Sequence, residues 1–129
     1  ILAHAMAPAV TLVDGSSTDP SIVARVKEIV AGRKAMVVLD SNHTHAHVLA
    51  ELRAYAPLVP AGSYLVVMDT VIERMPADFF PDRPWSRGDN AATAVAAFIA
   101  EDDRFEVDQA MDAKLMVSVA PGGYLRRRG

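Results

Sequence analysis

The sequence contains no cysteine, and this absence excludes several kinds of chemistry. A chain of 129 residues without a thiol cannot form a disulfide framework, a thiolate zinc site or a cysteine nucleophile. A cysteine-free composition suits a reducing compartment, so we expect a cytoplasmic location. Long hydrophobic runs are lacking as well, because the apolar runs are short, as in Tyr64–Met68. We therefore expect no membrane-spanning segment.

An excess of positive charge is also missing. The chain carries 13 Lys and Arg against 16 Asp and Glu, which gives a formal net charge of -3. The basic run Arg126–Arg128 stands at the end of the sequence, and we expect no nucleic-acid partner. The start, Ile1–Ala5, has neither Met nor a charged segment and does not look like a signal peptide.

The composition that is present is that of a globular domain. Hydrophobic residues make up 51% of the chain and charged residues 22%. A chain of this length buries roughly two-thirds of its unfolded surface, which is enough for one core. We therefore expect a single domain over residues 1–129.

Strand and helix patterns alternate along the chain and predict an α/β fold. The predicted helices are an apolar stripe over 22–30 after the cap Asp19-Pro20, a second stripe over 48–59 capped by Ser41 or Asn42, and a third over 95–99 capped by Asp89-Asn90. The predicted strands are Val10–Val13, Ala35–Leu39, Ser63–Met68, Phe105–Val107 and Leu115–Val119. The last two strands predict an antiparallel C-terminal pair, and 122–125 reads as a turn and tail. A Pro-rich irregular stretch follows Thr70.

Acidic residues end two of the predicted strands. Because ligands of open parallel sheets bind beyond the carboxyl ends of the strands, Asp40 and Asp69 are candidate site residues. If their strands are neighbours, the strand axes lie about 4.8 Å apart, and a divalent cation with oxygen ligands would relieve the repulsion. The alternative is that both carboxylates only cap the turns that follow.

His43 is the candidate general base. A position near a helix N-terminus disfavours the imidazolium, although a surface histidine in a loop is the simpler alternative. The spacing of His43, His45 and His47 would allow a zinc site in a strand. The segment leads into a helix, where such residues point in different directions, and this disfavours the zinc site. Trp85 lines a ring-bearing substrate or anchors the irregular stretch.

Several longer segments resemble the cephalosporin hydroxylase-like family. The matching segments are Gly15–Pro20, Val38–His43, His47–Leu52, Tyr55–Val59, Gly62–Val67, Asp69-Thr70, Pro81–Asn90 and Pro121–Leu125. The resemblance covers nearly everything from about Gly15 onward. It implies a class I S-adenosylmethionine-dependent methyltransferase fold, which is a three-layer Rossmann-like fold, and a relation to rhamnosyl O-methyltransferases.

The resemblance also implies roles for individual residues. Asp40 and Asp69 match the family's magnesium ligands, and His43 matches the base that takes a proton from the substrate hydroxyl. Gly15, Ser16 and Ser17 lie where this fold contacts the adenine end of S-adenosylmethionine. The implied reaction is metal-assisted O-methylation of a hydroxyl on a sugar-containing or antibiotic-like small molecule, and the family name leaves hydroxylation as the other chemistry.

Two departures from the family pattern weaken the assignment of these roles to this chain. Met68 stands where the family has an acidic metal ligand, so Mg²⁺ binding should be weaker. The glycine-rich turn of the cofactor site has no counterpart, and the chain resembles the C-terminal half of the fold without its first two strands. Such a chain would expose a strand edge beside Val37 or Val10, so we expect a homo-oligomer. The alternatives are a truncated, non-catalytic relic or interaction domain, and a zinc hydrolase built on the three histidines.

Overall fold

The computed structural model describes residues 4–129, and two of its helices, α1 and α3, begin at the caps that the sequence predicts. Asp19 accepts a hydrogen bond from the Ser21 N–H and starts α1, with Pro20 at the first helical position. Asn90 and Thr93 form a reciprocal capping box at the start of α3. The helices are α1 Pro20–Val30, α2 His45–Tyr55, α3 Ala91–Glu101 and α4 Gln109–Leu115, with 3-10 turns at η1 Ala7–Ala9, η2 Ala56–Leu58 and η3 Thr70–Arg74.

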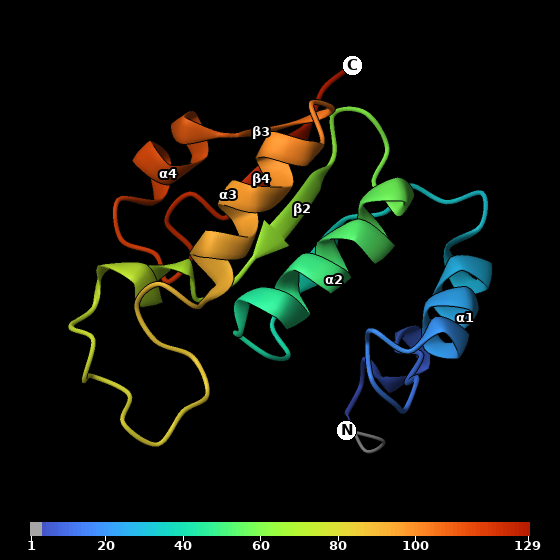
Figure 1. Ribbon diagram of the computed structural model, residues 1–129. Coiled ribbons are helices and arrows are strands. Elements are labelled where there is room, and N and C mark those ends of the chain that lie inside the picture. The colour runs from blue at the N-terminus through green and yellow to red at the C-terminus, as the bar shows by residue number, and fades with distance from the viewer. Residues whose placement is uncertain (1–3) are drawn as a thin grey trace.

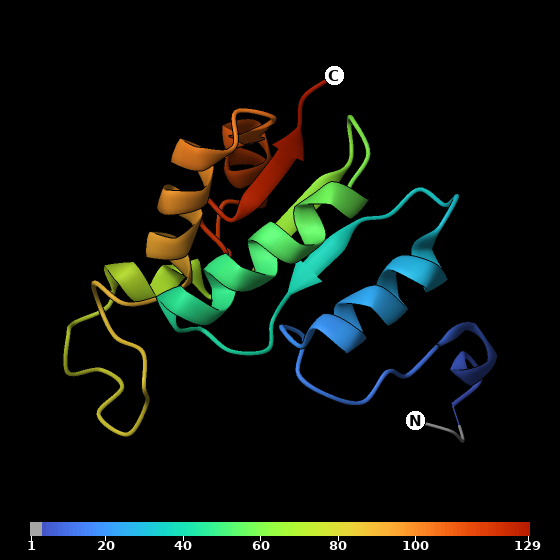
Figure 2. The same ribbon diagram turned by 45° about the vertical axis from the view of Figure 1, so that its right-hand side comes forward.

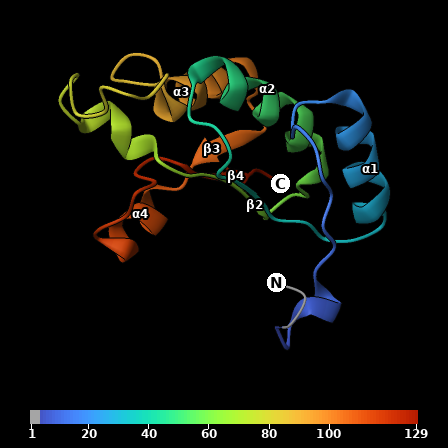
Figure 3. The same ribbon diagram turned by 90° about the horizontal axis from the view of Figure 1, so that it is seen from below.

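Four strands form one mixed sheet in the order β1-β2-β4-β3. The strands are β1 Val37–Leu39, β2 Tyr64–Val67, β3 Phe105–Val107 and β4 Tyr124–Arg127. β1 and β2 are parallel, with Leu39 opposite Val67, whereas β4 is antiparallel to both β2 and β3. Figure 1 shows α2 and α3 side by side across the sheet. Figure 3 shows α1, α2 and α3 on one face and α4 on the other. An α/β fold is confirmed.

The core lies between the sheet and the α2–α3 pair. Apolar side chains of the predicted α2 stripe are buried there against the sheet. The fully buried members include Leu52, Val59, Leu65, Phe105 and Leu125. Burial of this kind is the main source of stability, and it fixes the strands whose ends carry the candidate site.

Two predicted strands are wrong. Val10–Val13 is not in a sheet, because no neighbouring strand pairs with it in the described part of the chain, and Val10 and Leu12 are largely exposed. Leu115–Val119 is the end of α4 and the loop after it, because the Asp108 side chain accepts the Met111 N–H and starts a helix instead.

The C-terminal segment is also corrected. The predicted turn and tail over 122–125 runs into β4, whose first two residues are Tyr124 and Leu125. Because β4 fits between β2 and β3, the antiparallel C-terminal pair consists of β3 and β4. The expectation that Ile1–Ala5 is not a signal peptide concerns in part residues 1–3, which lie outside the described residues. Among residues 4–129, no helix is long and apolar enough to cross a membrane.

Candidate active site

The two candidate acids come together at the carboxyl ends of β1 and β2. Asp40 directly follows β1, and Asp69 lies two residues beyond Val67, the end of β2. Because the two strands are parallel neighbours, both carboxylates reach the same edge of the sheet. One ligand atom from each of Asp40, His43 and Asp69 can be chosen so that all three lie within 4.8 Å of one another. The predicted juxtaposition of Asp40 and Asp69 is confirmed.

Asp69 adopts an uncommon backbone conformation. Its φ of 57° and ψ of 23° lie in the left-handed region, which non-glycine residues other than Asn, Asp and His rarely occupy. The next residue, Thr70, is buried, and its hydroxyl donates to the carbonyl of Pro121 at 2.9 Å. This contact to the loop before β4 holds the turn that aims Asp69 at its neighbours.

His43 lies between Asp69 and the only tryptophan of the chain. Its Nε2 is 3.3 Å from Asp69 Oδ2, and its ring meets Trp85 edge to face at 4.8 Å between centroids. His43 precedes the helix rather than opening it, because α2 begins at His45 with Thr44 as its N-cap. The predicted N-cap of this helix, Ser41 or Asn42, is therefore wrong. Asn42 Oδ1 accepts the Thr44 N–H in the turn that leads into the helix.

The irregular stretch that carries Trp85 is anchored at its far end. Glu73 Oε2 accepts hydrogen bonds from the Gly88 N–H at 2.8 Å and from the Asn90 side-chain amide at 2.6 Å. These two donors hold the pKa of Glu73 below its usual range. Asn90 is fully buried, and its amide also donates to the carbonyl of Ser86. The anchored loop end keeps Trp85 against His43.

The three histidines do not converge on a zinc site. His45 Nδ1 lies 2.8 Å from Thr93 Oγ1, and the His45 N–H donates to Asp89. His47 points the other way, toward Ser17 and Glu51. Among the described residues, one cluster of side chains could hold a metal ion, and His43 is the only one of the three histidines in it. The helical spacing explains this divergence.

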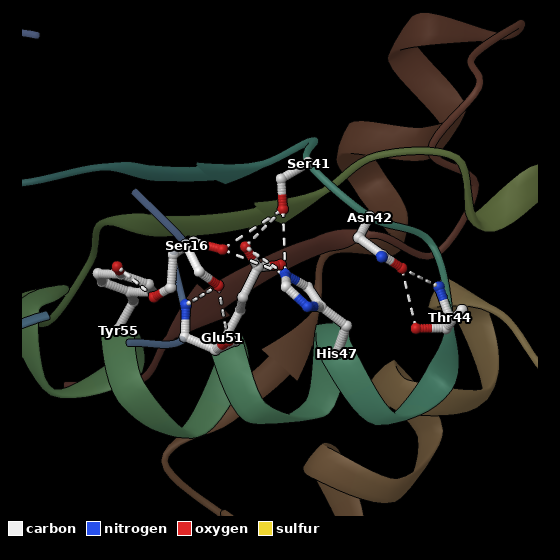
Figure 4. Close-up of polar contacts among 9 residues, drawn as sticks. Ser16, Ser41, Asn42, Thr44, His47, Glu51 and Tyr55 are labelled. Atoms are coloured by element: carbon white, nitrogen blue, oxygen red, sulfur yellow. Dashed lines mark hydrogen bonds and ion pairs between the residues drawn. The ribbon is translucent and has the colours of Figure 1, made fainter. Parts of the chain in front are cut away.

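A polar network on the opposite side of α2 was not predicted from the sequence. His47 Nε2 lies 3.1 Å from Ser17 Oγ and 3.3 Å from Ser41 Oγ, and the Ser41 hydroxyl donates to Glu51 Oε1 at 2.8 Å. Figure 4 shows the side chains of Ser41, His47 and Glu51 converging. The Tyr55 hydroxyl donates to the Ser17 carbonyl, and burial together with the charge of Glu51 raises the pKa of Tyr55. The His47–Glu51 spacing of four residues was the available signal.

The segment Gly15–Ser17 lies beside this network. Gly15 has a φ of 134°, and a Cβ there would meet the Ile22 side chain at 2.8 Å, so the turn requires glycine. Ser16 is exposed and pairs with Thr18 at 3.0 Å. Ser17 Oγ is 3.5 Å from Ser41 Oγ, next in sequence to Asp40. The turn is therefore close to the end of β1, although its contact with a cofactor stays a prediction.

Comparisons with known proteins identify the family of the chain. A family model described as rhamnosyl O-methyltransferase/CmcI matches residues 1–128. The rhamnosyl O-methyltransferase of Mycobacterium tuberculosis (strain ATCC 25618 / H37Rv) is 38% identical over 128 residues, covering 93% of this chain and 48% of that protein. The rhamnosyl O-methyltransferase of Mycobacterium leprae (strain TN) is 32% identical over 126 residues, covering 94% of this chain and 52% of that protein.

The chain spans about half the length of the curated relatives it matches. No solved structure matches it. The family match covers both strands of the candidate site, the loop with Trp85 and the C-terminal strand. The chain belongs to the rhamnosyl O-methyltransferase/CmcI family.

Proposed function

We propose that this chain forms the acceptor side of an O-methyltransferase that methylates a hydroxyl of a sugar-containing small molecule. The observation that carries the proposal is the group of Asp40, His43 and Asp69 at the ends of neighbouring strands, in a chain of this family. The parallel β1–β2 pair covered by helices supports the class I, Rossmann-like methyltransferase fold. A cytoplasmic location stays a prediction from composition.

The donor set suits a hard divalent cation such as Mg²⁺. Two carboxylates offer oxygen ligands, and Asp40 is exposed, which leaves room for water or a substrate hydroxyl. The thioether of Met68, directly before Asp69, is too soft to serve as a further ligand. A cation held by Asp40 and Asp69 would act as a Lewis acid that lowers the pKa of the acceptor hydroxyl.

His43 is proposed to take the proton from that hydroxyl. Its partly buried ring is oriented by Asp69 on one side and by Trp85 on the other, which limits its rotation. Removal of the proton turns the acceptor oxygen into a nucleophile, and a held geometry raises its reactivity. Trp85 also offers an aromatic wall next to the base, where a sugar ring would be placed.

Gly15, Ser16 and Ser17 are the proposed contacts to the methyl donor, S-adenosylmethionine. The fit is partial, because the Ser17 hydroxyl is already engaged by His47 and the sequence has no glycine-rich turn of the usual kind. The donor supplies the methyl group when bound. The proposed activity of the whole protein is therefore transfer of this methyl group to the acceptor hydroxyl, and this chain would contribute the metal ligands and the base.

Titration calorimetry with Mg²⁺ tests the metal site. Asp40→Asn and Asp69→Asn should each weaken binding by about 100-fold, whereas the control Asp103→Asn, an exposed acid before β3, should leave it unchanged. Met68→Glu should strengthen binding about tenfold, because it adds a third carboxylate beside the pair. Equal binding by all four variants would overturn the proposal.

Heat on addition of S-adenosylmethionine, with and without Mg²⁺, separates the enzyme from the non-catalytic alternative. The proposal predicts donor binding that is weakened by Ser16→Ala but not by the control Ser21→Ala on α1. Mg²⁺ binding without any donor binding would leave Asp40 and Asp69 as a metal site and remove this turn from the cofactor site.

A further inference from the structure

One side of α2 carries polar side chains that have no part in the proposed reaction. His47, Glu51 and Tyr55 follow one another at intervals of four residues, which places them on the same side of the helix. They face the turn before α1, and Figure 2 shows the start of α1 near the end of β1. The Tyr55 hydroxyl donates to the Ser17 carbonyl at 2.7 Å, and His47 Nε2 lies 3.1 Å from Ser17 Oγ. Ser17 is therefore held at its backbone and at its side chain.

Glu51 is the residue whose hydrogen-bonding role is fixed, because an ionised carboxylate accepts hydrogen bonds and cannot donate them. Its side chain is only 2% exposed. Its Oε1 accepts the Ser41 hydroxyl at 2.8 Å, whereas Oε2 is buried and has no hydrogen-bond partner in the described part of the chain. The bond from Ser41 therefore offsets part of the cost of burying this charge, and the Ser41 hydrogen is committed to Glu51.

The committed Ser41 hydrogen determines which ring nitrogen of His47 carries a proton. His47 Nε2 lies 3.3 Å from Ser41 Oγ and 3.5 Å from Glu51 Oε1, and Figure 4 shows the three side chains converging. A bare Nε2 would turn its lone pair toward a carboxylate oxygen and toward a hydroxyl whose hydrogen points elsewhere. Such an arrangement is unfavourable in a site shielded from water. Nε2 therefore carries a hydrogen, whether the ring is neutral or charged.

Ser17 is the last member of this series of hydrogen bonds. Because His47 Nε2 is a donor, Ser17 Oγ is the acceptor in their 3.1 Å contact, and this contact does not use the Ser17 hydrogen. Ser41 Oγ is 3.5 Å from Ser17 Oγ, which is too long for a strong hydrogen bond between hydroxyls. Ser17 is partly exposed, so its hydrogen is accessible to a ligand.

We propose that Glu51 sets the direction of these hydrogen bonds, so that Ser17 offers its hydrogen to an acceptor atom of the bound methyl donor. The ring nitrogens of adenine are acceptors of this kind. Glu51 and His47 are positioning residues, because both act through Ser17 rather than on the donor itself. The inference rests on the proposed role of Gly15–Ser17, and it explains how Ser17 can bind the donor although His47 already engages its oxygen.

The proton on His47 can be observed without any ligand. A two-bond ¹H–¹⁵N correlation spectrum of the unaltered chain should show a protonated Nε2. Glu51→Leu frees the Ser41 hydrogen to donate to Nε2, so part of the His47 population should move its proton to Nδ1. The control Glu101→Leu on α3 should leave the His47 signals unchanged. An unprotonated Nε2 in the unaltered chain, or no response to Glu51→Leu, would overturn the proposal.

Calorimetry with S-adenosylmethionine tests whether Glu51 acts through Ser17. Ser17→Ala and Glu51→Leu should each weaken donor binding about tenfold. The double variant should bind no more weakly than either single variant, because both changes remove the same hydrogen bond to the donor. Glu51→Gln keeps an acceptor oxygen for Ser41 and should restore binding to nearly that of the unaltered chain. Additive losses in the double variant would overturn the proposal.

The two measurements also separate this inference from the proposed function. An unprotonated Nε2 or additive losses would contradict the inference alone and leave the proposed methyl transfer in place. No donor binding by the unaltered chain would contradict the role of Gly15–Ser17 in binding the donor, and the role of Glu51 with it. If Glu51→Leu fails to fold, the spectrum of the unaltered chain and donor binding by Ser17→Ala still decide the matter.

Discussion

The two edges of the sheet are built differently. The β3 edge is flanked by charges: Arg104 pairs with Asp102 at 2.6 Å, and Arg128 pairs with Glu106 at 3.1 Å. The β1 edge carries the apolar side chains of Met36 and Val38, which are 63% and 50% exposed. Charged residues on an edge strand prevent pairing with another chain, and the β1 edge lacks this protection. The difference indicates that the β3 edge is protected against pairing with another strand, whereas the β1 edge is not.

The largest expected contrast is in stability. Phe105→Ala in β3 removes a ring that is 1% exposed and packs 5.5 Å from Phe98 between centroids. It should lower the free energy of unfolding by about 4 kcal/mol. Val38→Ala in β1 should change it by no more than about 0.5 kcal/mol, because half of that side chain is already in water. Urea unfolding measures both, and equal losses would mean that the β1 edge is as well packed as β3.

The charged edge should also respond to acid. Hydrogen bonds from the Arg104 guanidinium hold the pKa of Asp102 below its ordinary value of 3.8. A carboxyl with a lowered folded pKa stabilises the fold above its ordinary pKa, and this contribution is lost as pH falls through the folded pKa. Asp102→Asn should therefore flatten the decline of stability below pH 4. An unchanged slope in urea unfolding at several pH values would show that the pair contributes nothing to the edge.

The smallest expected effect comes from removing the Arg128–Glu106 ion pair. Both side chains are about half exposed, at 54% and 46%, so solvent screens their attraction. A double-mutant cycle of Arg128→Gln and Glu106→Gln should give a coupling of about 0.5 kcal/mol or less. A much larger coupling would mean that the pair stabilises β3 and β4 as well as keeping other strands away.

The local signals in the sequence were sufficient to predict most helices and strands of the fold. α1 and α3 begin at the caps Asp19 and Asn90, and β2 lies inside the predicted apolar run Ser63–Met68. Strand predictions failed where the presence of a neighbouring strand decides the outcome. Val10–Val13 pairs with no strand among residues 4–129, and Tyr124–Arg127 forms a strand because β2 and β3 flank it. A strand depends on neighbours that are distant in sequence.

The candidate site was also predicted only in part. Asp40 and Asp69 were predicted to meet because each ends an apolar run, and parallel neighbours share an edge. The Glu51 network was missed, because Ser17 reaches His47 across 30 residues and no local pattern reports that contact. The contact between His43 and Trp85 depends on the anchor of Glu73 and Asn90, which is also non-local.

Mn²⁺ titration followed by NMR tests directly whether the carboxyl ends of β1 and β2 hold a divalent cation, as we propose. Paramagnetic Mn²⁺ broadens the signals nearest to it. With a cation site at Asp40 and Asp69, substoichiometric Mn²⁺ should first broaden the amides of 41–43 and 69–70 and the Trp85 indole, and Asp40→Asn should abolish this pattern. Broadening centred instead on the acidic segment 101–103 before β3 would show that the cation binds elsewhere.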